Sequence, residues 1–66
     1  MEAIKNYLDR KNINYEVARQ HNDTDKIMIF TDGCVVKTRG YIKHYHSDKA
    51  KTRYNFGSDR LTIIEK

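Results

Sequence analysis

The chain has 66 residues, of which 38% are hydrophobic and 33% charged, and its formal net charge is +4. This length predicts a single domain over residues 1–66 with a thin core, because so short a chain buries only about 60% of its unfolded surface. No stretch approaches the roughly 20 apolar residues of a membrane span. The single cysteine, Cys34, excludes an internal disulfide and favours a reducing, cytoplasmic location.

The composition also carries a hint about the source. Lysine, isoleucine, asparagine and tyrosine are frequent, whereas proline and tryptophan are absent. Such a composition is typical of AT-rich coding sequences. It favours a low-GC bacterium, or a phage or mobile element living in one.

The first predicted element is a helix from Glu2 to about Asn12. Ile4 and Leu8 lie four residues apart, as required for one apolar side of a helix. Asn12 is suited to the left-handed conformation that commonly ends a helix. An element of this length is only marginally stable alone, so we expect it to pack on the rest of the domain.

After this helix the apolar period changes to two, which predicts strands. Residues 13–18 alternate between apolar and polar, and residues 26–31 form the most apolar run, predicted to be a central strand. Asp32-Gly33 is a strong hairpin signal, because a type I′ turn needs positive φ at both positions. Residues 34–46 then predict a long strand with a bulge at Gly40.

Two shorter strands, at 51–56 and 60–65, complete the predicted fold. The class is α+β, with an N-terminal helix packed on a small antiparallel sheet, a meander of about five strands. Such a sheet leaves a face or an edge open, through which two copies could form a symmetric dimer. Cys34 is expected to face the core, where a thiol is inert. The predicted core comprises Ile4, Leu8, Ile27, Ile29, Phe30, Val36, Leu61 and Ile63.

The excess positive charge lies in one segment of the chain. Residues 37–54 hold six basic residues and one acid, a net charge of +5, whereas the remainder holds seven basic and eight acidic residues. On a strand over 34–46, alternate side chains would place cations and tyrosines on one face, next to two cations of the following strand. This basic-aromatic set comprises Lys37, Arg39, Tyr41, Lys43, Tyr45, Lys51 and Arg53.

The basic-aromatic set predicts nucleic-acid binding, because cations neutralise phosphates and tyrosine rings stack on unpaired bases. Two alternatives stay open. A solvated sheet face carries the same residue types for solubility alone. Tyrosine and arginine also dominate protein interfaces, so the chain could be a phage- or mobile-element-encoded protein that binds and inhibits or adapts a host protein.

The sequence predicts neither catalysis nor a cofactor. Ser47 and Ser58 each precede an aspartate in a predicted turn, and no glycine-rich loop is present. His44 and His46 would share one side of a strand, and Cys34 or His21 could join them, but their spacing matches no known zinc site. We therefore expect a non-enzymatic binding protein without a metal.

Overall fold

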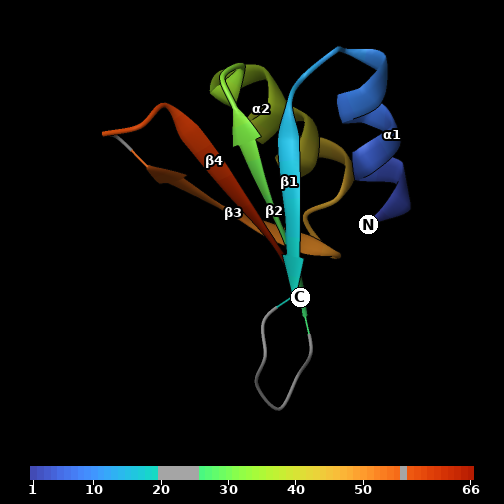
Figure 1. The fold of residues 1–66 in the computed structure, drawn as a ribbon. Helices are drawn as coiled ribbons and strands as arrows, with labels where there is room; N and C mark the ends of the chain where they lie inside the picture. Colours follow the sequence, from blue (N-terminus) through green and yellow to red (C-terminus); the bar gives the residue numbers. More distant parts are fainter. Residues whose placement is uncertain (20–25, 56) are drawn as a thin grey trace.

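The computed structural model describes residues 1–19, 26–55 and 57–66. The described elements are α1 (Glu2–Arg10), β1 (Tyr15–Arg19), β2 (Ile27–Asp32), α2 (Val35–Tyr45), β3 (Ala50–Asn55) and β4 (Arg60–Glu65). The strands form a four-stranded antiparallel sheet in the order β1-β2-β4-β3, and both helices lie on one side of it (Figure 1). The predicted α+β class, the N-terminal helix and the antiparallel sheet are therefore confirmed. Within the described part of the chain, neither helix is long and apolar enough to cross a membrane.

The long strand predicted at residues 34–46 is wrong, because this segment forms α2. The sheet consequently has four strands, slightly fewer than expected, and it is not a meander, since β4 lies between β2 and β3. The hairpin predicted at Asp32-Gly33 is also wrong: Asp32 ends β2 without positive φ, and the residues with positive φ are Gly33 (71°) and Cys34 (51°), after which the chain enters α2. The Gly33 N–H donates to the Asp59 carbonyl at 3.2 Å, which ties this turn to the β3–β4 connection.

Helix α2 forms against the preferences of its own sequence, which is rich in β-branched and aromatic residues and contains Gly40 at its centre. Packing decides the outcome. Val35, Thr38 and Ile42 follow one another at helical spacing and are all buried. Val36, predicted to be in the core, is instead 84% exposed, because the helix turns it away from the sheet. The predicted bulge at Gly40 is likewise absent.

The core lies between the two helices and one face of the sheet. Its buried apolar side chains are Ile4, Leu8, Ile13, Ile29, Val35, Ile42, Ala50, Leu61 and Ile63. Of the other predicted core residues, Ile27 is half-buried at the margin of this cluster. Phe30 is half-buried on the opposite face of the sheet, because neighbouring strand residues point to opposite faces.

Helix α1 ends in a complete Schellman motif. Asn12 has φ 56°, as its type predicted, and its N–H donates to the Asp9 carbonyl at 3.2 Å. The Ile13 N–H donates to the Leu8 carbonyl at 3.0 Å, and both of these side chains are buried. The motif directs the chain into β1. There, desolvation and a hydrogen bond with Asp9 raise the pKa of the Tyr15 hydroxyl.

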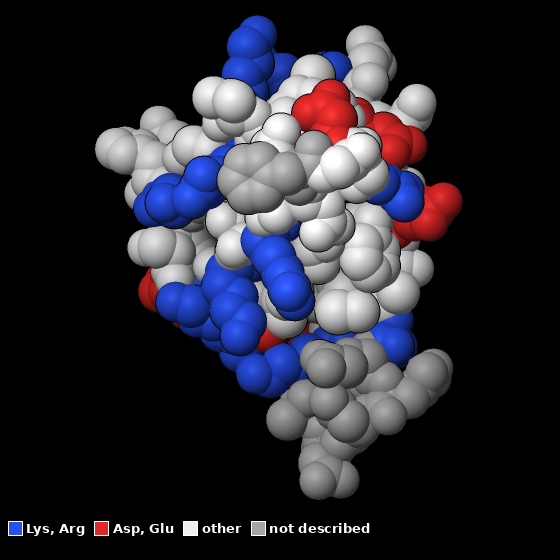
Figure 2. Space-filling view, turned by 90° about the vertical axis from the view of Figure 1, so that its left-hand side faces the viewer, with Lys and Arg blue, Asp and Glu red and all other residues white. Residues whose placement is uncertain are grey.

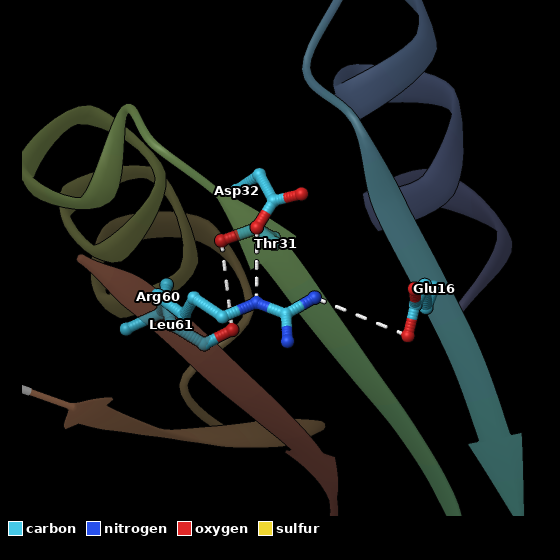
Figure 3. A network of polar contacts seen from close by, with 5 residues as sticks. All are labelled: Glu16, Thr31, Asp32, Arg60 and Leu61. Carbon is cyan, nitrogen blue, oxygen red and sulfur yellow. Dashed lines mark hydrogen bonds and ion pairs between the residues drawn. The ribbon is translucent and has the colours of Figure 1, made fainter. Parts of the chain in front are cut away.

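The second face of the sheet, which we call the outer face, carries no helix in the described residues. Arg60 of β4 extends along this face across β2 towards β1 (Figure 3). Its Nε lies 2.9 Å from Asp32 Oδ1, and its Nη2 lies 3.9 Å from Glu16 Oε2. Both carboxylates are largely exposed, so these ion pairs align three strands while adding little to the free energy of unfolding.

Candidate functional site

Helix α2 divides the basic-aromatic set instead of displaying it on one face. Residues four apart share a side of a helix, so Arg39 and Lys43 lie together on the side towards β3. Lys37, Tyr41 and Tyr45 lie together on the other side, towards α1. The prediction of one continuous basic-aromatic sheet face is therefore wrong, because the helical period replaces the period of two on which it rested.

The β3-facing side of α2 forms a groove with this edge strand, which we call the α2–β3 groove. It consists of two hollows of about 420 Å³ and 240 Å³, and Lys43 lines both. The larger hollow is lined by Val35, Val36, Arg39, Gly40, Lys43 and Tyr54. The smaller hollow is lined by Ile42, Lys43, Ser47, Ala50, Lys51, Thr52 and Lys66. The groove thus combines an apolar base with cations along its length.

The cations of the groove have no acidic partners in the described part of the chain. The ion pairs found there join Lys5 to Glu2, and Arg60 to Glu16 and Asp32. Figure 2 views the side of the molecule on which α2 and β3 lie, and Lys and Arg side chains gather on its left and lower parts. Most visible acidic side chains lie at the upper right. Uncompensated charge of one sign attracts ligands of the other sign.

Strand β3 contributes to two surfaces because its side chains alternate. Tyr54 points to the helix side and lines the larger hollow. Lys51 points to the outer face, and its side chain also lines the smaller hollow. Arg53 lines neither hollow and lies on the outer face, in register with Thr62 of β4. The structure therefore places Arg39 and Lys43 around the larger hollow, and Lys43 and Lys51 around the smaller one. Lys51 and Arg53 share the outer face, but only Lys51 also lines the groove.

The α1-facing side of α2 has a structural role. The Tyr41 ring stacks on the Tyr7 ring, with centroids 3.8 Å apart and an interplanar angle of 7°. The Tyr41 hydroxyl and His46 Nε2 form a hydrogen bond of 2.9 Å. Tyr41 thus joins the two helices, so its ring cannot serve as an open platform for a base. Tyr45, by contrast, is 65% exposed.

Among the groove residues outside the predicted set, Tyr54 and Gly40 line the larger hollow. Alternation along residues 51–56 already placed Tyr54 on the face opposite Lys51 and Arg53, so the sequence contained that signal. Gly40 could have been found only by recognising the helix, from the spacing of Val35 and its buried partners.

The candidate metal ligands are also rearranged. Cys34 is exposed rather than in the core, because it begins α2 at the surface. His44 lies in the last turn of α2, whereas His46 follows the helix and bonds to Tyr41. His21 lies outside the described residues. In residues 1–19, 26–55 and 57–66, no three His, Cys, Asp or Glu side chains form a group that could hold a metal ion.

No protein-family model, curated protein or solved structure matches this chain.

Proposed function

We propose that the protein binds nucleic acid, without catalysis, by holding the phosphate backbone in the α2–β3 groove. The observation that carries this proposal is the set of cations, Arg39, Lys43 and Lys51, that border one groove and have no acidic partner in the described residues. Binding a phosphate to such a cation releases condensed counterions from the nucleic acid.

The shape of the groove favours a single strand. Its hollows are small, and the larger one has cations on its helix side and Tyr54 on its strand side. A phosphate at Arg39 or Lys43 would place the adjoining base near the apolar residues and the tyrosine of the same hollow. Base–aromatic contacts of this kind contribute about 1–3 kcal/mol each and tolerate any base.

The test is a fluorescence-anisotropy titration with short single- and double-stranded oligonucleotides at two salt concentrations. We expect the Arg39→Ala and Lys43→Ala variants each to weaken binding to all sequences. Each should also lower the slope of log affinity against log salt by about one unit, because one phosphate contact is lost. Single strands should bind more tightly than duplexes.

Lys37→Ala is the matched control, since Lys37 lies on the same helix but on the side away from the groove. This variant loses the same charge and should bind as the native protein does. Equal losses for Lys37→Ala and Lys43→Ala would show that net charge, rather than the groove, governs binding. A dissociation constant above about 100 μM at low salt would mean an affinity weaker than ordinary non-specific binding, and it would refute the proposal.

A further inference from the structure

The outer face of the sheet has an ordered distribution of charge, of which the groove shares only Lys51. The strand register aligns its side chains in three rows that run across the sheet. One row is Ala18, Met28, Ile64 and Lys51; the next is Glu16, Phe30, Thr62 and Arg53; the third is Asp32, Arg60 and Asn55. Half-buried apolar side chains thus occupy the centre, with an acid at the β1 edge and bases at the β3 edge.

This arrangement is complementary to itself. A two-fold axis that runs along the strands, between β2 and β4, would bring two outer faces together. It would exchange β1 with β3 and β2 with β4, while leaving each residue in its own row. Glu16 would then face Arg53 of the second copy, and Phe30 would face Thr62. Each contact would occur twice, as two-fold symmetry requires.

The remaining rows match under the same operation. Met28 of one copy would face Ile64 of the other, so the apolar centres would cover each other. Asp32 would face Arg60 of the second copy, which forms an alternating cluster of four charges with the Arg60–Asp32 pair already present in each copy. No row brings two like charges into opposition. We therefore propose that the outer face binds a second copy of this chain.

The size of the face sets the strength of the contact. Four strands about 4.8 Å apart and about 20 Å long give a footprint of roughly 400 Å² on each copy. Two such faces together lie below the area of standard stable interfaces, so the dimer should be transient. We expect a dissociation constant on the order of 10–100 μM, in rapid exchange with the monomer.

The experiment is sedimentation velocity without nucleic acid, at protein concentrations from about 5 to about 500 μM. This range brackets the dissociation constant expected for an interface of this size. The native protein should shift from 7.9 kDa towards twice that mass as its concentration rises. Glu16→Arg alone should place two Arg–Arg oppositions in the dimer, and Arg53→Glu alone should place two Glu–Glu oppositions there. Each variant should associate at least tenfold more weakly.

Mixing these two variants provides the decisive measurement. In the mixed pair, Arg at position 16 faces Glu at position 53, and the native Arg53 faces the native Glu16, so both contacts are attractive again. The mixture should therefore dimerise although neither variant does so alone. Circular dichroism of each variant shows that it remains folded. Lys37→Glu, a charge reversal away from the outer face, should associate as the native protein does.

The inference is overturned if the native protein stays at 7.9 kDa over the whole range, or if the mixture remains monomeric. A loss of association in Lys37→Glu equal to that in Arg53→Glu would also overturn it, since net charge would then be the cause. The measurement contains no nucleic acid, so its outcome is independent of the proposed function.

Discussion

Gly40 is the position at which the helical conformation of α2 can be tested most directly. It is the central residue of the helix, it is exposed, and an added Cβ would have no atom within 4 Å. Only backbone preference therefore changes on substitution. In a helix, Gly40→Ala should raise the free energy of unfolding by about 1 kcal/mol, whereas Gly40→Val should raise it by less than half as much.

A strand at the same position would reverse this order, because β-branched valine is favoured over alanine in strands. The assay is thermal and urea denaturation of both variants followed by circular dichroism. For a domain of this size, 1 kcal/mol corresponds to a rise in Tm of about 4–8 °C for Gly40→Ala. A Tm for Gly40→Val equal to or above that for Gly40→Ala would refute the helix. Gly33→Ala is the control of opposite sign, since φ of 71° there is costly for alanine.

Three further predictions concern the core and the rings. Ile29→Ala should cost about 2–5 kcal/mol, much of the stability of so small a domain, because Ile29 is fully buried; a urea midpoint close to the native value would contradict this. Thr38→Val should stabilise the protein by about 1 kcal/mol in the same assay, because the buried Thr38 hydroxyl has no hydrogen-bond partner among the described residues. Tyr41→Ala should lower Tm through loss of the interhelical stack. Tyr45→Ala loses ring contacts with Tyr41 and His44 on an exposed side chain, so it should lower Tm less than Tyr41→Ala and leave oligonucleotide affinity unchanged; a binding loss would extend the site beyond the groove.

Most of the sheet can be predicted from the sequence, because the residue pattern of each strand is recognisable without knowing the other strands. Predicted strands at 26–31, 51–56 and 60–65 correspond to β2, β3 and β4 within one residue at each end. In each, the face towards the helices is apolar or uncharged over most of its length, and polar connecting residues bound the run. The sequence also predicted α1 and its ending at Asn12, where side-chain type and positive φ agree.

Residues 34–46 could not be assigned in the same way, since two periods fit them. Alternating cations and tyrosines favour a strand, as does the abundance of valine, threonine and tyrosine. The spacing of Val35, Thr38 and Ile42 favours a helix equally well. The choice depends on β4 pairing with β2, whose paired residues lie 28 (Asp32 and Arg60) to 36 (Met28 and Ile64) positions apart in sequence; this pairing displaces the intervening segment from the sheet. No local sequence pattern indicates a pairing between two strands so far apart in the chain.

The sequence predicts the part of the candidate site that depends on where charge lies along the chain. It does not predict the part that depends on whether residues 34–46 have the period of a helix or of a strand. The +5 segment between residues 37 and 54 contains all the groove cations except Lys66. The Lys66 ammonium donates a hydrogen bond to the Ser47 carbonyl, and both residues line the smaller hollow. Which cations meet depends on the period of α2, which turns Lys37 away from Arg39 and Lys43, and on the alternation of β3, which places Arg53 on the outer face.

If the protein binds nucleic acid in the groove and dimerises through the outer face, its affinity should depend on the length of the oligonucleotide. Pairing through the outer faces leaves the helix side of each sheet, and with it Arg39 and Lys43 of each α2–β3 groove, open to solvent; Lys51 alone belongs to both surfaces. A long oligonucleotide could then occupy both grooves of a dimer, whereas a short one could occupy only one. Simultaneous occupation should strengthen binding of a strand of about 60 nucleotides well beyond that of one of about 10, by tenfold or more at concentrations where dimers form.

The ratio of these two affinities is the appropriate measurement, because it cancels the change in net charge of each variant. Glu16→Arg and Arg53→Glu alter the net charge in opposite directions, yet both should reduce the ratio. It should fall towards the value for a monomer, which depends only on the number of positions at which one groove can bind along each oligonucleotide. The double variant Glu16→Arg/Arg53→Glu restores the opposed charges and should recover the native ratio. If the two single variants instead change the ratio in opposite directions, charge rather than pairing governs the long strand, and the two surfaces act independently.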